Sequence, residues 1–281
     1  MPTISRHGHH LHLSFGKALS RGMHFASASN VASLLGLLPD SKAPFSTLFS
    51  LEQQVSNPMP FALKWGLCHE MNGVASVLNS FQEVSAQLAS KHQFCISESV
   101  CAHEQGLQLV HHDHPMLQQG TVFGQPSAQY AIAALPDAKL VGNGSELLLE
   151  VKCVCPFIEK DDGTGWFHLP FKTAFKGVSM KHYVQCQVQM LATSVSHCLL
   201  RWDVTGCKVF YAPFDGVWCR CMVCMLSIVL LAAAPLSGNS PDFTAIPSYK
   251  KFVGCTKERC SAVEELCDVD SEQGAVSARW L

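Results

Sequence analysis

The 281-residue sequence lacks an apolar run long enough to cross a membrane. The longest such run, Met222 to Leu236, has fifteen residues, whereas a spanning helix needs about 20. We therefore predict a buried helix there and no membrane association. A secretory signal is also lacking, because MPTISRHGHHLHLSF places His and Arg where such a signal would be apolar. The 14 cysteines are accordingly expected to be thiols in a reducing, intracellular compartment.

An excess of basic residues is absent as well. Lys and Arg number 20 against 22 Asp and Glu, which gives a formal net charge of −2. A protein that binds nucleic acid mainly by neutralising phosphates would be basic, so any contact with DNA must be local. No internal repeat is visible, and 48% hydrophobic residues suffice for one large domain. We predict a flexible N-terminal segment (1–20), a main domain (21–235) and a peripheral C-terminal tail (236–281).

The order of predicted elements indicates an α/β fold. Apolar residues at helical spacing predict one long helix over 62–90, and a β pattern follows from 130 to 157. A second helix is predicted over 179–194, followed by two strands, 198–204 and 207–212. This order predicts a central mixed β-sheet flanked by helices.

Asn143-Gly144 is the strongest local signal for a two-residue hairpin turn, because both central positions of a type I′ turn need positive φ. With these residues as the loop, paired residue numbers sum to 287. The expected pairs are Gly142 with Ser145, Leu140 with Leu147, Ala138 with Leu149, and Asp137 with Glu150. A turn of three or four residues would shift this register.

This hairpin gathers charged side chains on one face. Asp137 would lie opposite Glu150, with Cβ atoms roughly 4.5–5.5 Å apart, and Lys152 lies on the same face as Glu150. Like charges at that spacing are destabilising, so the pair favours a hard divalent cation, Mg²⁺ or Mn²⁺. The alternative is an ordinary solvated hairpin on which Lys139 and Lys152 pair with the two carboxylates.

Pro136-Asp137 and the string Glu150-Val151-Lys152, thirteen residues after the Asp, resemble the PD-(D/E)XK nuclease signature. Within that superfamily, LLLEVKCVCPF is similar to the LLEIKCPF segment of YqaJ-like viral recombinases, which are relatives of phage lambda exonuclease. The resemblance implies a restriction-endonuclease-like core. It also implies that Asp137, Glu150 and the Val151 carbonyl bind metal and that Lys152 assists the nucleophile.

Three further segments resemble this family in the same order. Lys64 to Glu70 is similar to the WGxxxE helix, which implies that Glu70 lies close to the metals. Tyr183 to Met190 is similar to the YxQxQxxM helix, which implies that Gln185 or Gln187 lies beside the catalytic lysine. Near the start of the chain, an RxTAS-like segment implies that three residues hold a terminal 5′-phosphate: Arg21, Ser27 and Ser29.

The resemblance implies a magnesium-dependent exonuclease that digests duplex DNA from 5′ ends in recombination or repair, as a ring-shaped homo-oligomer. The chain departs from the family at three places, the first of which is Arg21, one residue further from its serines than in the family pattern. Ala138 follows Asp137 where the family has Gly, and seventeen residues (118–134) separate the HPWL-like segment 114–117 from Leu135-Pro136. These departures leave open a non-catalytic protein that keeps the nuclease fold and binds DNA or another protein.

Other clusters have weaker signals. Lys172 and Lys176 lie among aromatic residues and are either a DNA-backbone contact or a solvated face. Cys221 and Cys224 could form a zinc site only with a second pair, Cys255 and Cys260, in which case the chain would be a zinc-stabilised interaction domain. The His-rich stretch 111–114 is expected to be a solvated loop.

Overall fold

The computed structural model describes residues 3–7, 10–14, 23–38, 61–95, 100–102, 129–134, 136–142, 144–153, 157–159, 166–168, 177–203, 207–232 and 242–269. Within these ranges, two larger sheets and one small two-stranded sheet are present. The small sheet pairs β8 (Phe157–Glu159) with β9 (Trp166–His168).

The central sheet has six strands in the order β12-β11-β10-β7-β6-β4. Its members are β4 (Val100–Ala102), β6 (Ala138–Gly142), β7 (Ser145–Cys153), β10 (His197–Asp203), β11 (Cys207–Pro213) and β12 (Glu264–Val269). β7 and β10 are parallel, and the other neighbouring pairs are antiparallel. The sheet is therefore mixed and has helices on both faces, which confirms the predicted α/β fold.

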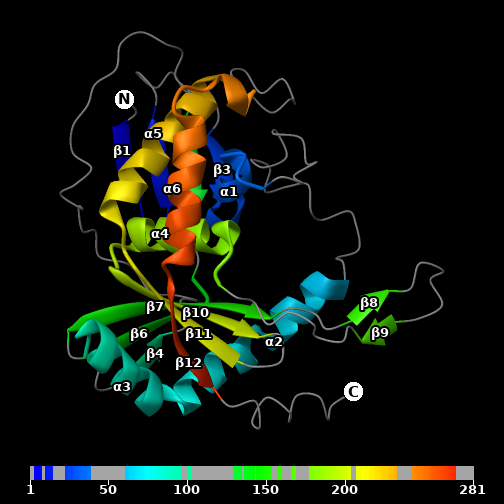
Figure 1. Cartoon of the computed structure of the whole chain (residues 1–281), viewed down its shortest axis with the longest axis vertical. Helices are drawn as coiled ribbons and strands as arrows, with labels where there is room; N and C mark the ends of the chain where they lie inside the picture. Colours follow the sequence, from blue (N-terminus) through cyan, green and yellow to red (C-terminus); the bar gives the residue numbers. More distant parts are fainter. Residues whose placement is uncertain are drawn as a thin grey trace.

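Successive side chains of β7 point to opposite faces of the sheet, so this strand contributes to the core on both sides. Leu147 and Leu149 point to the face covered by α2 (Phe61–Asn79) and α3 (Phe81–His92), where they share a core with Val77 and Leu88. Leu148 points to the opposite face, where it packs with residues of α4 (Met180–Thr193). The sheet thus lies between α2 and α3 below and α4 above (Figure 1).

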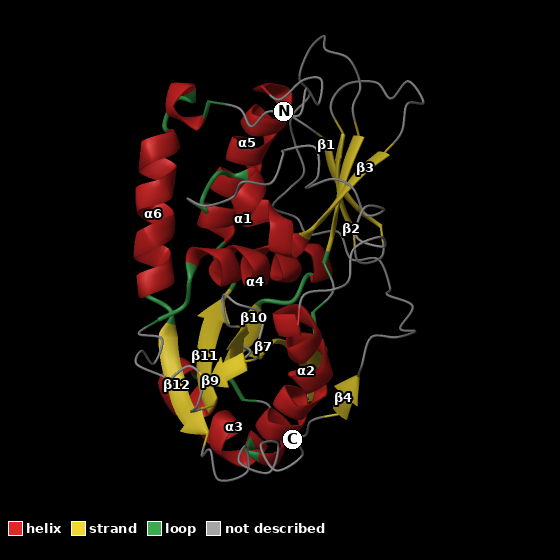
Figure 2. Ribbon diagram, turned by 90° about the vertical axis from the view of Figure 1, so that its right-hand side faces the viewer, coloured by secondary structure: helices red, strands yellow, loops and turns green. Residues whose placement is uncertain are grey.

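α4 is the middle layer of the molecule. On its far side lie η1 (Ala28–Asn30), α1 (Val31–Leu34), α5 (Gly216–Ala232) and α6 (Tyr249–Ser261). A four-stranded sheet of order β1-β2-β5-β3 stands beside them (Figure 2), formed by β1 (Thr3–His7), β2 (His10–Ser14), β3 (Met23–Ser27) and β5 (Gln129–Ala133). Every residue of α4 from Tyr183 to Ala192 is buried, as expected of a helix enclosed on all sides.

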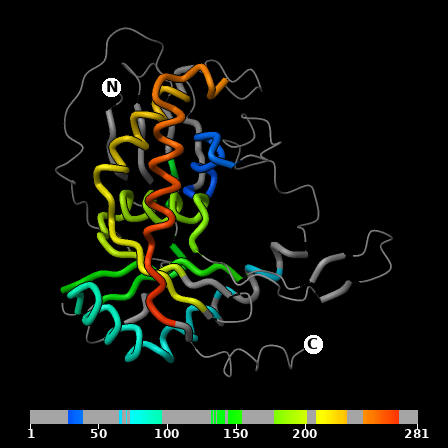
Figure 3. The backbone as a smooth tube through the Cα atoms, in the orientation of Figure 1, coloured from blue at the N-terminus to red at the C-terminus, as the bar shows by residue number. Residues whose placement is uncertain are grey.

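The C-terminal segment differs from its predicted peripheral position. Phe252 and Cys260 of α6 are buried in the core with α4 and α5, and β12 extends the central sheet at its edge. Figure 3 follows α6 from the upper part of the molecule down to β12 in the sheet. The Tyr249 hydroxyl donates to the carbonyl oxygens of Leu35 (3.0 Å) and Gly36 (2.7 Å), which ties α6 to the turn after α1.

Two other expectations also differ from the structure. The long helix predicted over 62–90 is two helices, because the chain turns at Ser80 between α2 and α3. The segment 1–20, predicted to be flexible, contains β1 and β2, which pair with each other antiparallel. Among the described helices, none is both long and apolar enough to span a bilayer.

Candidate active site

The hairpin formed by β6 and β7 has the predicted register. Ala138 pairs with Leu149, Leu140 with Leu147 and Gly142 with Ser145, while Gly144 has a φ of +74° in the turn. The ladder ends at Ala138, so Asp137 lies just before the strand. Its Oδ2 accepts a hydrogen bond from the Val151 backbone N–H (2.5 Å), which holds Asp137 against the residue that follows Glu150.

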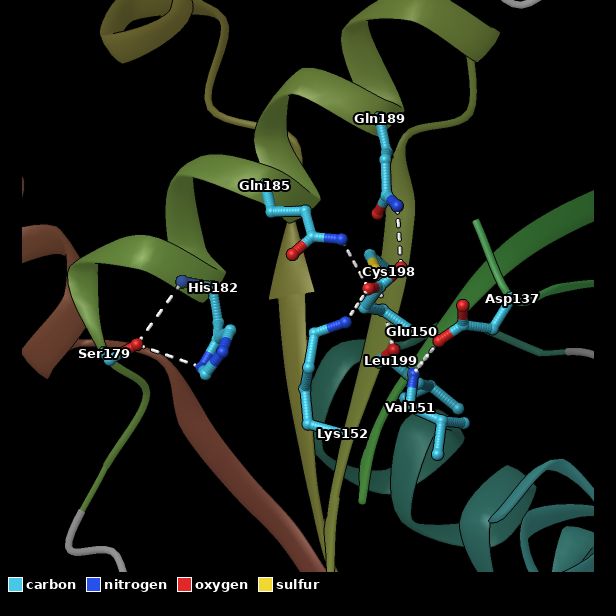
Figure 4. A network of polar contacts seen from close by, with 10 residues as sticks. All are labelled: Asp137, Glu150, Val151, Lys152, Ser179, His182, Gln185, Gln189, Cys198 and Leu199. Atoms are coloured by element: carbon cyan, nitrogen blue, oxygen red, sulfur yellow. Dashed lines mark hydrogen bonds and ion pairs between the residues drawn. The ribbon is translucent and has the colours of Figure 1, made fainter. Parts of the chain in front are cut away.

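Glu150 lies at the centre of a buried network (Figure 4). Only 1% of it is exposed, and Oε1 accepts hydrogen bonds from Lys152 Nζ and Gln185 Nε2, the second at 2.5 Å. Its other oxygen, Oε2, accepts from Gln189 Nε2 at 2.6 Å. The alternative of a solvated hairpin face is therefore wrong for Glu150. Lys139 instead pairs with Glu146, at 2.6 Å.

Helical spacing decides which glutamines reach the site. Gln185 and Gln189 are four residues apart and share one face of α4, whereas Gln187 is rotated by about 200° from Gln185. Gln187 faces the opposite way, where its Nε2 donates to the Pro213 carbonyl (2.8 Å) and its Oε1 accepts from the Asp215 N–H (2.9 Å). The structure thus brings Gln185 to Glu150 and places Gln187 elsewhere. Gln189 was not predicted to be a site residue, although its four-residue spacing from Gln185 indicates the same face of the helix.

The N-terminal end of α4 lies beside Lys152. Ser179 caps the helix, and its Oγ accepts from the His182 backbone N–H (3.3 Å) and lies 2.9 Å from His182 Nδ1. Burial, together with the positive charges of Lys152 and Lys181, lowers the pKa of His182 to about 3, so this imidazole is neutral. His182 was not identified as a site residue from the sequence.

Glu70 reaches the site because α2 packs closely on β7. A Cβ atom at Gly66 would lie 3.4 Å from the Cys153 carbonyl oxygen, so Gly at this position suits a close approach of helix and strand. Glu70 follows one turn later on α2, and it lies close enough to Asp137 to raise the pKa of that carboxyl. The predicted group of Glu70, Asp137, Glu150 and Lys152 is thus brought together.

Burial governs the electrostatics of this group. It raises the pKa of Glu150 to about 7 and that of Asp137 to about 6, against the opposing effect of Lys152. The negative charge of Asp137 raises the Glu150 pKa further, and Glu70 does the same for Asp137. Burial alone would lower the pKa of Lys152, but Glu150 and Asp137 outweigh it and raise this pKa, so the ammonium stays charged.

Asp137 and Glu150 offer oxygen ligands of the kind that Mg²⁺ or Mn²⁺ takes. Within the described ranges, no three His, Cys, Asp or Glu side chains are arranged so that they could hold an ion together. Mg²⁺ is usually bound through one or two carboxylates and keeps several waters, and Asp137 with Glu150 supplies that number. Burial raises the pKa of both carboxyls despite the opposing effect of Lys152, so a bound cation would stabilise their ionised forms.

The residues predicted to contact DNA are only partly described. Arg21, Lys172 and Lys176 lie outside the described residues, as does the His-rich stretch 111–114. Ser27 is the last residue of β3, and Ser29 lies in η1, which packs against α4. The backbone of η1, which contains Ser29, therefore lies against the helix that carries Gln185 and Gln189.

The cysteines considered for zinc lie on two helices. Cys221 and Cys224 are exposed on α5, whereas Cys255 and Cys260 of α6 are half-buried and buried. They form no metal-binding group in the described part of the chain, and the cysteines described there are free thiols. The structure therefore gives no support to a zinc-stabilised interaction domain.

Comparison with known proteins gives limited results. No family model and no curated protein matches the chain. A solved structure of an alkaline exonuclease, LHK-Exo from Laribacter hongkongensis, is 15% identical over 83% of this chain and 92% of its own, with a TM-score of 0.37. The complex of LHK-Exo with dAMP is 14% identical over the same shares, with a TM-score of 0.38. Likenesses at this level do not establish an activity for this chain.

Proposed function

We propose that this protein is a metal-dependent nuclease that hydrolyses DNA phosphodiester bonds. The observation that carries the proposal is the buried Glu150 carboxylate, which lies beside Asp137 and is paired with the ammonium of Lys152. Buried carboxylates with raised pKa values are typical of functional sites rather than of surface hairpins. Magnesium or manganese is the proposed cofactor, and duplex DNA is the proposed substrate.

Each side chain of the site has a separate task in this proposal. Asp137, Glu150 and the Val151 carbonyl would hold the cation, and the Val151 N–H already fixes the Asp137 carboxylate. A bound Mg²⁺ or Mn²⁺ would neutralise charge and polarise the phosphate as a Lewis acid. Lys152, whose raised pKa keeps it charged, would stabilise negative charge that develops on the phosphate. Glu70, which lies beside Asp137 and raises its pKa, would complete the acidic group.

The finer assignment rests on the resemblance to lambda-type exonucleases. On this basis, the protein would be a homo-oligomer that digests duplex DNA from its 5′ ends in recombination or repair. Arg21, Ser27 and Ser29 would bind the terminal phosphate, and Lys172 and Lys176 would follow the DNA backbone. The packing of η1 against α4 supports this, because it brings η1, which contains Ser29, next to the helix that carries Gln185 and Gln189.

A second candidate is a nuclease fold that binds DNA without cutting it. The observation in its favour is that both Glu150 oxygens already accept hydrogen bonds from the protein. Ala138 also favours this candidate, because it follows Asp137 where the nuclease family that the sequence resembles has Gly. In this candidate the carboxylates no longer take part in hydrolysis.

The test uses linear duplex DNA labelled at either the 5′ or the 3′ end, with Mg²⁺ or EDTA. We expect Mg²⁺-dependent release of nucleotides, with the 5′ label released first. Lys152→Ala should lower the rate at least about 100-fold, because it removes charge stabilisation in the transition state. Lys250→Ala is the matched control, since Lys250 is an exposed lysine on α6. Tight DNA binding without degradation at any Mg²⁺ or Mn²⁺ concentration would favour the second candidate.

A further inference from the structure

We propose that Gln189 is a positioning residue that fixes the orientation of the Glu150 carboxylate for metal binding. The inference rests on the proposed function and deepens it, because it assigns a role to a residue outside the motif positions that suggested the site. It starts from the unequal distribution of donors around Glu150.

Among the described residues, two side chains donate to one oxygen of Glu150 and one side chain donates to the other. Lys152 and Gln185 both donate to Oε1, whereas Gln189 Nε2 donates to Oε2 at 2.6 Å (Figure 4). The terminal torsion of a Glu side chain has a broad, roughly two-fold energy profile, so the carboxylate plane is not fixed by its own rotamer. A donor on each oxygen is what fixes that plane.

Gln189 is itself enclosed by the packing of α4. None of its surface is exposed, and it lies between Val188 and Met190 in the buried stretch of α4. Its backbone carbonyl accepts a hydrogen bond from Thr193 Oγ1 (2.8 Å) in the last turn of the helix. A site is well positioned when the supporting residues are themselves locked by packing. No bulk water can replace the amide at this depth.

The chemical type of the donor also matters. An amide donates a hydrogen bond without adding charge, so Glu150 keeps the full negative charge that a cation requires. A second Lys or Arg at this position would neutralise the carboxylate and compete with the metal. Gln189 therefore orients Glu150 and leaves its charge available, whereas Lys152 is the cationic partner of Glu150 in the described part of the chain.

The test compares Gln189→Met with Gln187→Met. Both substitutions replace a fully buried glutamine of α4 with an apolar side chain of similar length, but only Gln189 contacts Glu150. We expect Gln189→Met to weaken Mn²⁺ binding about 10–100-fold, as is typical when a group that orients a metal ligand is removed. Gln187→Met should lower the melting temperature and leave the Mn²⁺ affinity of the folded protein within twofold of wild type.

Mn²⁺ affinity is measured by titration calorimetry and by electron paramagnetic resonance of free Mn²⁺, on protein that circular dichroism shows to be folded. Gln189→Asn, which withdraws the amide by one methylene, is the second variant if the Met variant does not fold, and it should show the same loss. Unchanged affinity in a folded Gln189 variant would overturn this inference alone. A wild-type protein that binds no Mn²⁺ would overturn the proposed function as well.

Discussion

The metal-free protein should lose stability as the pH rises, because of Glu150 and Asp137. Burial raises the Glu150 pKa from 4.5 to about 7 and the Asp137 pKa from 3.8 to about 6. The folded state therefore binds more protons than the unfolded state between about pH 4 and pH 7. In that window the free energy of unfolding falls with rising pH, and the loss is complete only above the folded-state pKa values.

The magnitude follows from the change in proton affinity. Each pKa unit corresponds to about 1.4 kcal/mol, so Glu150 alone should lower the free energy of unfolding by about 3 kcal/mol across the window. Mg²⁺ should reverse this loss above pH 7, since it binds the ionised carboxylates of the folded state. At a hundredfold excess over its dissociation constant, the gain should be about 2.7 kcal/mol.

Urea unfolding in EDTA and in Mg²⁺, at half-unit steps from pH 5 to pH 8, measures both effects. The control is the double variant Asp137→Asn/Glu150→Gln, which retains the other titrating groups, including the 14 histidines. The wild-type stability minus that of the variant isolates the two carboxylates. The reasoning is refuted if this difference is independent of pH in EDTA, or if Mg²⁺ stabilises the variant as much as the wild type.

Three further predictions concern the packing of the helices and the sheet. Gly66→Leu should push α2 away from the Cys153 carbonyl and lower nuclease activity at least tenfold, because it moves Glu70. Gly66→Ala should be tolerated, since its Cβ would lie 3.4 Å from that carbonyl oxygen. Equal nuclease activities of the two variants would show that the close approach of α2 to β7 is irrelevant. Gly36→Ala should cost about 2–4 kcal/mol in urea unfolding, since Gly36 has a φ of +64° and a Cβ there would lie 2.7 Å from the Phe243 ring. Gly144→Ala, at positive φ in open space, should cost only about 1 kcal/mol, and similar costs at both glycines would contradict the clash. Leu266→Ala should cost about 2–5 kcal/mol because Leu266 is buried in the core beneath the sheet, and a cost below 1 kcal/mol would mean that β12 is peripheral after all.

The hairpin and α4 could be predicted from the sequence because their signals are local. Asn143-Gly144 determines a turn type, the turn determines the register, and Ser179 is a helix cap that the sequence displays directly. The position of Asp137 was predicted less well, because a strand-pair argument assumes that the ladder continues through it. In the structure, the ladder stops at Ala138 and Asp137 bonds to the Val151 backbone instead.

The remaining features depend on tertiary contacts that local patterns do not contain. β12 is rich in acidic residues and buries Leu266 on the sheet, so its pairing with β11 is set by the partner strand rather than by its own periodicity. The choice among Gln185, Gln187 and Gln189 depended on which face of α4 meets β7. All three glutamines are buried, so burial could not have distinguished them.

The parallel strands β7 and β10, with α4 in the crossover between them, form a βαβ unit. Asp137, Glu150, Lys152, Gln185 and Gln189 all lie in this unit or just before it, and of the site residues that the structure describes, Glu70 comes from elsewhere. One short stretch of gene therefore encodes nearly the whole described site. Such a stretch can be inherited or exchanged as a block, while the surrounding helices diverge without separating the residues that have to act together.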